Sequence, residues 1–284
     1  MPELPEVETM RRGILPIVGS RVEDVRRARC AKRPILVAPR LPAFRRRAVG
    51  SSIASVDRAG KRLVVRLDTG DSIVFEPRMT GLVLLAAPPT GEHLRLRIAL
   101  SGGKTRELLF WDRRGLGSVR LVSPREFEEL YGARKLGPDA LSSSAEELRA
   151  RLAGSRREIK VALLDQRALA GVGNLYASEI LHLAGIHPER RCDRLRVADW
   201  QRIHAAMIEV LEAAIRCEGS TLSDGTYRNA LNEAGDYQNQ HRVYDRAGRP
   251  CTRCGQAAIK RIVQAQRSTF YCPRCQRKGA GARH

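Results

Sequence analysis

Four cysteines near the end of the chain have the spacing of a metal site. They form two C-x2-C pairs separated by seventeen residues: Cys251, Cys254, Cys272 and Cys275. Four thiolates in two close pairs suit one tetrahedral Zn²⁺, and this spacing lies within the range of zinc ribbons. Two structural disulfides are the alternative, but no other feature of the sequence is typical of a secreted protein. We therefore predict one structural zinc ion in a finger formed by residues 241–284.

The sequence around these cysteines is strongly basic. Residues 241–284 contain eleven Lys and Arg and a single acid, Asp245. This segment carries half of the chain's formal net charge of +20 at pH 7, and the pI of the whole chain is near 10.6. A basic hairpin held by a metal is a common way to place arginines on a nucleic-acid backbone. The charge therefore predicts a polyanionic partner, with a merely basic surface as the alternative.

A second reactive group lies at the N-terminus. Removal of Met1, which is usual before a small residue, leaves Pro2 with a free secondary amine. An α-amino group titrates near pH 8, about two units below a lysine, so a useful fraction is neutral and nucleophilic at pH 7. Glu3 can move protons beside this amine, and Glu6, one helical turn further on, can tune the amine or order a water. The alternative is that Pro2 only begins a helix and that both acids stabilise its positive end.

Composition excludes several classes of protein. The 284 residues are enough for two domains of ordinary size. No apolar run approaches the roughly 18–20 residues of a membrane span. Three glutamates within the first eight residues and the lack of an apolar core segment argue against a signal peptide. Cys30, Cys192 and Cys217 have no cysteine close in sequence with which to pair. The number of cysteines, seven, is odd, and four of them lie in the metal pattern, which indicates a reducing cytoplasm.

The first part of the chain predicts a β-sandwich. Val7, Met10 and Ile14 recur with helical spacing and predict an amphipathic helix from about Pro5 to Val18. Short runs of strand-forming residues, separated by turn signals, follow this helix. The predicted strands are Ser52–Val56, Leu63–Leu67, Ile73–Phe75, Leu82–Ala86, His93–Leu100, Leu108–Trp111 and Ser118–Val122. Residues 1–122 are therefore expected to form a sandwich that carries one helix.

The pattern becomes helical after residue 122. Ser123-Pro124-Arg125-Glu126 is a helix start with a capping box, and the stretch from Ser144 to Glu147 repeats the box. Asp199 is predicted to cap a long helix that continues to about Cys217. Residues 220–240 are rich in Gly, Asn, Asp and Ser and predict a long polar loop, a kind of segment that is often functional. The predicted domains are residues 1–122, 123–240 and 241–284.

Several further motifs occur in a fixed order along the chain. They are Met1-Pro2-Glu3-Leu4-Pro5-Glu6-Val7-Glu8, Leu136-Gly137-Pro138, Gly171-Val172-Gly173-Asn174-Leu175-Tyr176-Ala177-Ser178-Glu179, Ala184-Gly185-Ile186-His187-Pro188 and Gln266-Arg267-Ser268-Thr269-Phe270-Tyr271-Cys272. Together with the zinc spacing, they resemble the formamidopyrimidine-DNA glycosylases (Fpg) of the Fpg/Nei family over essentially the whole chain. The implied fold is α+β: an N-terminal helix on a two-layer β-sandwich, then a helix–two-turn–helix domain and a C-terminal zinc finger. The implied partner is damaged double-stranded DNA, bound in the cleft between these parts by a monomer.

The resemblance also implies an activity. It predicts a bacterial base-excision repair enzyme, a DNA glycosylase and AP lyase that removes oxidised purines such as 8-oxoguanine and formamidopyrimidines. Pro2 would form a Schiff-base intermediate followed by β,δ-elimination, with Glu3 and Lys61 as further catalytic residues and Glu6 in support. The enzyme would work in the cytoplasm, on the nucleoid. An endonuclease VIII-like enzyme for oxidised pyrimidines and a non-catalytic zinc-ribbon protein that binds damaged DNA are the alternatives.

Several residues match positions at which the family contacts the DNA backbone. Lys61 follows Ala59-Gly60 at the tip of a predicted hairpin and resembles the lysine that contacts the phosphate beside the lesion. Lys160, Asn174 and Arg267 resemble further backbone ligands. Asn174 is also expected to cap the helix that follows the turn at Gly171-Val172-Gly173, because Asn is a good N-cap.

The family inserts side chains into the gap left by the flipped base. Met79 matches the methionine that fills the gap, and Arg114 matches the arginine that reads the orphaned base. Leu116 stands where the family has a phenylalanine, and it offers less stacking area. The sequence also has Glu76 in place of the usual histidine and Arg78 in place of the usual glycine. These departures leave the lesion spectrum and the preferred opposite base open.

Overall fold

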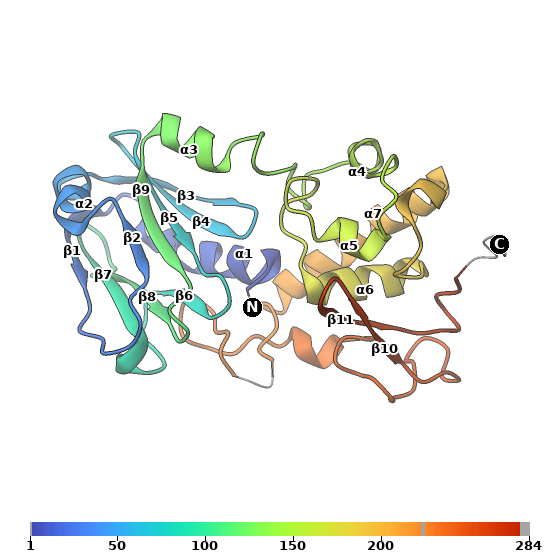
Figure 1. The fold of residues 1–284 in the computed structure, drawn as a ribbon. Coiled ribbons are helices and arrows are strands. Elements are labelled where there is room, and N and C mark those ends of the chain that lie inside the picture. Colours follow the sequence, from blue (N-terminus) through green and yellow to red (C-terminus); the bar gives the residue numbers. More distant parts are fainter. Residues whose placement is uncertain (1, 223–224, 279–284) are drawn as a thin grey trace. The chain divides into compact units, whose positions relative to one another are not determined.

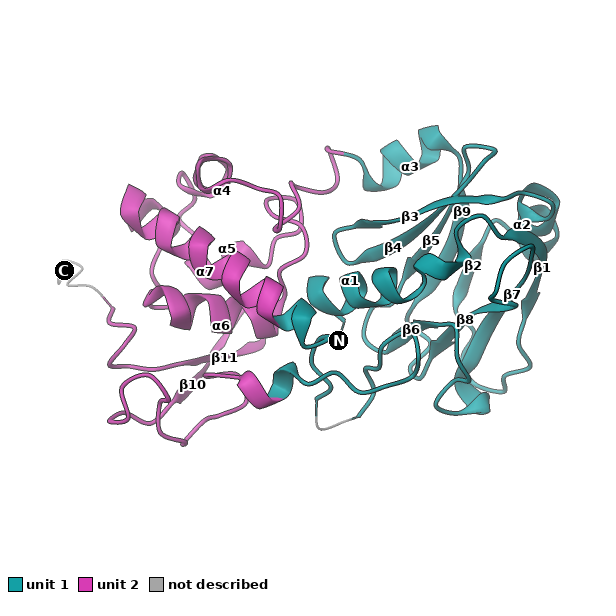
Figure 2. Cartoon of the chain, turned by 180° about the vertical axis from the view of Figure 1, so that it is seen from behind, with its two compact units in different colours: residues 1–132, 214–238 teal, residues 133–213, 239–284 magenta. Residues whose placement is uncertain are grey.

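The computed structural model describes residues 2–222 and 225–278. The chain forms two compact units: residues 1–132 with 214–238 make unit 1, and residues 133–213 with 239–284 make unit 2 (Figure 2). Helix α7 (Val197–Arg216) begins in unit 2 and ends in unit 1. The predicted domain boundaries at residues 122 and 240 are not tested by this division into two units and stay a prediction. Among the described residues, no helix is both long and apolar enough to cross a membrane.

Unit 1 is built on two β-sheets (Figure 1). One sheet has the strand order β1-β7-β8-β6 and the other has the order β2-β9-β5-β4-β3. The strands are β1 (Arg21–Arg27), β2 (Leu36–Ala38), β3 (Ile53–Ala59), β4 (Arg62–Leu67), β5 (Ser72–Glu76), β6 (Gly81–Leu84), β7 (Leu94–Ser101), β8 (Glu107–Asp112) and β9 (Ser118–Val122). Their buried apolar side chains form one continuous core. The predicted α+β fold with a two-layer sandwich is confirmed, and all seven predicted strands are present.

Helix α1 (Leu4–Gly13) packs its apolar face into this core. Val7 and Met10 are fully buried, in agreement with the helical spacing of the sequence. The helix is shorter than expected, because Gly13 weakens it and Pro16 disfavours helical backbone at the preceding residue. A short 3-10 helix, η1 (Leu15–Ile17), takes the place of the last predicted turn. A Cβ atom at Gly13 would lie 2.5 Å from Cβ of Ala230, so glycine lets residues 220–240 approach the helix.

Strands β1 and β2 and helix α2 of unit 1 were not predicted from the sequence. Strand β1 buries only three of its seven residues, so its alternation is weak. Helix α2 (Leu41–Ala48) buries only Phe44 and Ala48, and its polar face is occupied by arginines. The expectation of a single helix in residues 1–122 was therefore wrong. These elements are held by tertiary packing, since α2 packs against β1 and β2.

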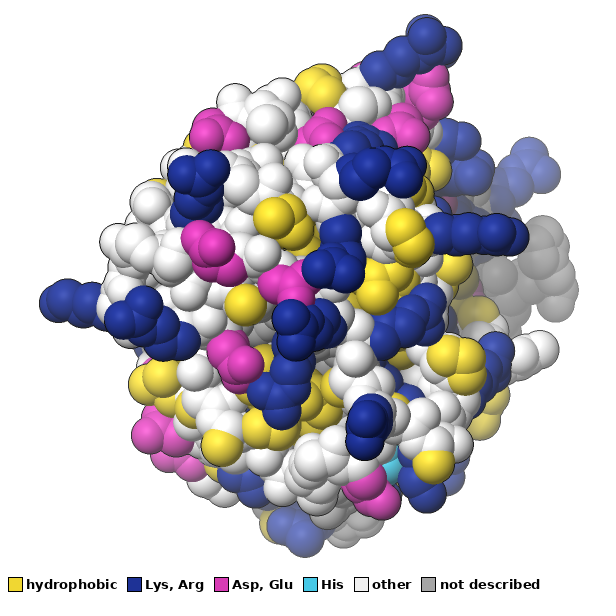
Figure 3. Space-filling view, turned by 90° about the vertical axis from the view of Figure 1, so that its left-hand side faces the viewer, with side chains coloured by type: hydrophobic (Ala, Val, Ile, Leu, Met, Phe, Trp, Pro, Cys, Tyr) yellow, Lys and Arg dark blue, Asp and Glu magenta, His cyan; other side chains and the backbone are white. Residues whose placement is uncertain are grey.

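Basic side chains are spread over the end of unit 1 where these elements lie (Figure 3). Arg26 and Arg45 both pair with Asp24, and Arg47 pairs with Asp71 at 2.9 Å. Acidic side chains between the blue ones in the figure show that the charge here is partly neutralised. Basic side chains are thus not confined to the zinc finger.

The remaining helices belong to both units. They are α3 (Pro124–Tyr131) in unit 1, α4 (Ala145–Leu152), α5 (Ile159–Leu163) and α6 (Asn174–Ala184) in unit 2, and the 3-10 helices η2 (Gly91–His93), η3 (Cys192–Arg194) and η4 (Tyr237–Gln240). The capping boxes predicted at Ser123 and Ser144 are both present. Asp199 does not cap α7, because the helix begins two residues earlier and the carboxylate instead accepts the backbone N–H of Arg196 at 3.0 Å. Strands β10 (Lys260–Gln264) and β11 (Arg267–Tyr271) form the hairpin of the finger.

Candidate active site

The start of α1 holds Pro2 in a fixed position. Glu3 is the N-cap, with extended backbone, and its N–H donates to Oε2 of Glu6 at 2.8 Å. Pro2, Glu3 and Glu6 are all buried. An ionised carboxylate at this end of a helix is favoured by the helix dipole. The candidate nucleophile and its acidic neighbours therefore share one rigid helix start.

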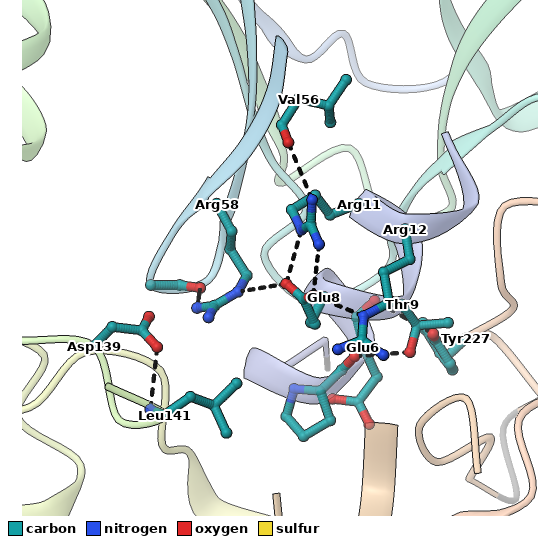
Figure 4. Close-up of polar contacts among 12 residues, drawn as sticks. Glu6, Glu8, Thr9, Arg11, Arg12, Val56, Arg58, Asp139, Leu141 and Tyr227 are labelled. Atoms are coloured by element: carbon teal, nitrogen blue, oxygen red, sulfur yellow. Dashed lines mark hydrogen bonds and ion pairs between the residues drawn. The ribbon is translucent and has the colours of Figure 1, made fainter. Parts of the chain in front are cut away.

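Glu6 also reaches a part of the chain that is remote in sequence. Its Oε1 accepts the N–H of Ser220 at 2.9 Å. The hydroxyl of Tyr227, which lies beside Glu6 in Figure 4, donates to the backbone carbonyl of Glu6 at 3.3 Å. Burial and the charge of Glu6 raise the pKa of the Tyr227 hydroxyl well above its usual value, so this hydroxyl stays a donor. The observed contacts give Glu6 a structural task. Its supporting role in catalysis stays a prediction.

A pocket opens beside Pro2 within unit 1. Its lining is drawn from the start of α1, the loop before β6 and residues 220–227: Pro2, Met79, Thr80, Leu82, Ser220, Leu222, Thr226 and Tyr227. The segment predicted as a long polar loop is well packed here, since Ser220, Thr226 and Tyr227 are buried. Sequence reasoning marked this segment as functional by composition but did not find the lining residues. The pocket brings two predicted site residues, Pro2 and Met79, to one place.

Glu8 anchors α1 to the sheet and was missed by the sequence analysis. Its carboxylate accepts hydrogen bonds from Arg11 at 2.9 and 3.0 Å, from Arg12 at 2.8 Å and from Arg58 of β3 at 3.2 Å (Figure 4). Burial tends to raise the pKa of this carboxyl, but the hydrogen bonds from Arg11 and Arg12 and the charges of Arg11 and Arg58 hold it at about 2. Glu8 is therefore ionised throughout the working pH range.

The predicted hairpin tip with Lys61 is confirmed. Strands β3 and β4 pair up to Ala59 and Arg62, which leaves Gly60 and Lys61 as the two-residue turn. Gly60 has a φ of 58°, which suits glycine, and its carbonyl accepts from Nη1 of Arg58 at 2.9 Å. Arg58 thus links the Glu8 carboxylate to the hairpin that carries Lys61. The predicted contact of Lys61 with a phosphate is not tested by this geometry.

The predicted intercalating residues lie on two loops of unit 1. Met79 and Leu116 are unusually exposed for apolar side chains, at 37 % and 38 %, and Arg114 is exposed beside Leu116. Two of the three departures from the family pattern contact each other, since Arg78 lies 3.5 Å from Glu76. Glu76 is buried and also bonds Arg62 at 2.5 Å. Arg78 has a φ of 53°, which explains why glycine is favoured at this position.

In unit 2, the structure brings two predicted DNA ligands together. The buried Lys160 donates from Nζ to the side-chain oxygen of Asn174, and the amide of Asn174 donates to the carbonyl of Ser268 at 3.0 Å. Arg267 is the neighbour of Ser268 and is exposed at the start of β11. Asn174 does not cap α6, because the N-cap is Gly173 and the side chain of Asn174 is turned toward the finger hairpin. These contacts join α5, α6 and the finger.

The four finger cysteines fit one zinc ion. All their sulfur atoms lie within 4.8 Å of one another, and the Cys251–Cys275 and Cys254–Cys272 sulfurs are 3.9 and 3.8 Å apart. Tetrahedral Zn–S bonds of about 2.3 Å place thiolates about 3.8 Å apart, so these two spacings fit a structural zinc. The small apolar cluster of the finger could not hold the fold alone. His182 of α6 lies 3.4 Å from the Cys251 sulfur, and burial lowers the pKa of this histidine to about 4.

Comparison with known proteins identifies the family. Residues 1–119 match the N-terminal domain of formamidopyrimidine-DNA glycosylase, and residues 136–226 match its H2TH domain. Residues 248–277 match the zinc finger found in FPG and IleRS. The formamidopyrimidine-DNA glycosylase of Chloroflexus aggregans is 41 % identical over 97 % of this chain and 98 % of its own length. The chain belongs to the formamidopyrimidine-DNA glycosylase family.

Solved structures of Fpg proteins share the fold. A mutant of the Lactococcus lactis FPG, in complex with a Fapy-dG containing DNA, has a TM-score of 0.85 at 33 % identity, with 98 % of this chain and all of that chain covered. MutM in complex with carbocyclic 8-oxo-G containing DNA has a TM-score of 0.84 at 32 % identity and the same coverage. The resemblance stated from the motifs is confirmed, as are the family's three-part fold and its structural zinc.

Proposed function

We propose that the protein is a base-excision repair enzyme, a DNA glycosylase that removes oxidised purines from double-stranded DNA and cleaves the strand as an AP lyase. The observation that carries the proposal is the position of Pro2, which stands at the start of α1 and lines a pocket with Met79 and Tyr227. The relatives bound to Fapy-dG and 8-oxo-G DNA support formamidopyrimidines and 8-oxoguanine as substrates. The family match favours oxidised purines over the oxidised pyrimidines of an endonuclease VIII-like enzyme.

The chemistry begins with the free amine of Pro2. After removal of Met1, the nitrogen lone pair attacks C1′ of the damaged nucleoside, and the base leaves with the bonding electrons and takes up a proton. The sugar ring then opens: the C1′–O4′ electrons move to O4′, which is protonated, while the proline nitrogen loses its proton. The product is an iminium ion between Pro2 and C1′.

Strand cleavage follows from the acidity of this iminium. Loss of a C2′ proton expels the 3′ phosphate by β-elimination, and loss of a C4′ proton expels the 5′ phosphate by δ-elimination. Water hydrolyses the iminium and restores the amine. We assign Glu3, beside Pro2 on the rigid helix start, to the proton transfers at the sugar. A pocket that excludes water around these groups would favour the covalent route.

The DNA contacts are assigned by position. We place Lys61 on the phosphate beside the lesion and Lys160, Asn174 and Arg267 on the DNA backbone, because each is a cation or an amide donor at a position that resembles a backbone ligand of the family. Met79, Arg114 and Leu116 would fill the gap left by the flipped base. We further propose that the enzyme works as a monomer in the bacterial cytoplasm, on the nucleoid.

Borohydride trapping tests the nucleophile. Reduction of the iminium should join the protein to an 8-oxoguanine duplex, and peptide mapping should place the link at Pro2. Pro2→Gly, or a protein that retains Met1, should lose most of the crosslink and still bind a duplex with an abasic-site analogue. A crosslink that maps to a lysine would contradict the assignment of the nucleophile. A full-strength crosslink with oxidised pyrimidines and none with 8-oxoguanine would contradict the substrate class.

A further inference from the structure

The two loops that carry the proposed intercalating residues are tied to each other by a small hydrogen-bond network. The first loop precedes β6 and contains Met79 and Thr80, and the second follows β8 and contains Arg114 and Leu116. β6 and β8 are paired, with Gly81 opposite Asp112. The network therefore forms where the two paired strands meet their loops, entirely within unit 1.

Thr80 and Asp112 are the centre of this network. The Thr80 hydroxyl donates to Oδ1 of Asp112 at 2.5 Å and accepts the backbone N–H of Arg114 at 2.9 Å. The other oxygen of Asp112 accepts the N–H of Gly117 at 2.7 Å. Both side chains are buried, and Asp112 is 0 % exposed. One carboxylate and one hydroxyl thus fix both ends of the loop that carries Arg114 and Leu116.

Arg95 of β7 holds the same loop from another side. This arginine is 4 % exposed, and its Nε donates to the carbonyl of Asp112 at 2.8 Å. Its Nη2 reaches the carbonyl of Arg113 at 3.4 Å, and its Nη1 reaches that of Arg33 at 3.0 Å. A buried arginine must have its donors satisfied, and here loop carbonyls satisfy them. The guanidinium therefore fixes the backbone just before Arg114.

Thr80 also lines the pocket beside Pro2. Its side chain is the direct link between that pocket and the backbone of Arg114. The second loop contacts the pocket wall once more, where Nη1 of Arg113 lies 3.5 Å from the hydroxyl of Thr226. A shift of the second loop must therefore move groups that line the pocket. Polar networks of this kind act as a unit, because loss of one member leaves buried partners unsatisfied.

We infer that Thr80, Asp112 and Arg95 are positioning residues that make the two loops one rigid wedge and couple it to the base pocket. The inference rests on the proposed function, since it assigns Arg114 to the orphaned base and the pocket to the flipped base. Through Thr80, the base opposite the lesion affects how well the pocket is formed. Discrimination between opposite bases is thus a property of the network as well as of the Arg114 side chain.

Thr80→Val is the main test, because valine keeps the branched shape and removes only the hydroxyl. The measurement is the single-turnover rate of excision of 8-oxoguanine opposite cytosine and opposite adenine. Valine removes both hydrogen bonds of the Thr80 hydroxyl, but the N–H of Arg114 keeps a bond to Oδ1 of Asp112 at 3.2 Å. The ratio of the two rates should therefore fall roughly fivefold, which corresponds to about 1 kcal/mol. Thr80→Ser should restore the ratio. Thr90→Val is the matched control. The Thr90 hydroxyl accepts a hydrogen bond from the Trp111 side chain, but in the variant that side chain keeps its 2.8 Å bond to the Thr90 carbonyl, so the ratio should not change.

The role of Arg114 separates the outcomes. In an Arg114→Ala background, Thr80→Val should leave the ratio unchanged, because the arginine side chain that contacts the orphaned base is no longer present. Asp112→Asn should lower the ratio as Thr80→Val does. The ratio of the variant that combines Thr80→Val with Asp112→Asn should be no lower than that of the poorer single variant. Equal slowing on both duplexes, or an unchanged ratio, would overturn the inference. Absence of any excision or crosslink by the unaltered protein would instead refute the proposed function.

Discussion

Replacement of Glu8 by glutamine should destabilise the protein in a pH-dependent way. The Glu8 carboxyl has a pKa of about 2 in the folded protein against an ordinary value of 4.5. A difference of 2.5 units corresponds to roughly 3.4 kcal/mol of stability at pH 7. The side chain is 9 % exposed and one partner, Arg12, is 57 % exposed, so solvent screening reduces this to about 2 kcal/mol. Glu8→Gln should therefore lower the free energy of unfolding by about 2 kcal/mol at pH 7.

The sign of the pH dependence follows from the lowered pKa. The stabilisation is complete above pH 4.5, where Glu8 is ionised in both states, and is lost as pH falls toward 2. The difference in the free energy of unfolding between Glu8→Gln and the unaltered protein should narrow by roughly 1 kcal/mol between pH 7 and pH 4. Urea unfolding at several pH values measures it.

Glu129→Gln is the matched control, because Glu129 pairs with Arg125 at 2.9 Å on an exposed helix surface. Such a pair contributes about 0.3–0.5 kcal/mol, so this variant should differ little from the unaltered protein at any pH. A stability difference for Glu8→Gln that does not change from pH 7 to pH 4 would refute the reasoning. A difference as small as that of Glu129→Gln would mean that the arginine network does not anchor α1.

Three further predictions concern other parts of the chain. Cys272→Ser should release the zinc, measured by metal analysis with a colorimetric chelator, and should abolish damage-specific DNA binding, because metal binding provides most of the finger's folding energy. Gly13→Val should lower the melting temperature by overpacking worth about 1–3 kcal/mol, because its Cβ would meet Ala230, and it should slow excision more than binding. Arg267→Ala should weaken binding to any duplex and lower the slope of log affinity against log salt by about one, whereas a change in lesion preference alone would contradict a phosphate contact.

Local patterns predicted those parts of the structure that depend on local geometry. The capping boxes at Ser123 and Ser144, the turn at Gly60 and Lys61 and the paired cysteines all involve groups a few residues apart, whose hydrogen bonds or ligand geometry follow from spacing. The order of the motifs then indicated the family. Strands β1 and β2 and helix α2 were missed because few of their side chains are buried, so none of them has a clear period.

The contacts that complete the candidate site are long-range and have no sequence signature. The bond between Glu6 and Ser220 joins residues 214 positions apart, and the one between Thr80 and Asp112 joins residues 32 positions apart. In the sequence Glu8 is an ordinary acid near a helix start, and its bond from Arg58 of β3 joins residues 50 positions apart. Asn174 was assigned as a cap because its type suits one, but a partner on β11 takes its side chain.

The discontinuous composition of unit 1 has a consequence for how the protein is synthesised. The sandwich comes from residues 1–132, whereas Ser220, Tyr227 and Ala230, which contact α1, come from residues 214–238. A ribosome adds residues from the N-terminus at about 5–20 per second, so the sandwich emerges several seconds before its pocket wall. During that interval the pocket beside Pro2 lacks the wall formed by residues 220–227. The amine of Pro2, our proposed nucleophile, therefore lacks this wall of its pocket until most of the chain has been made.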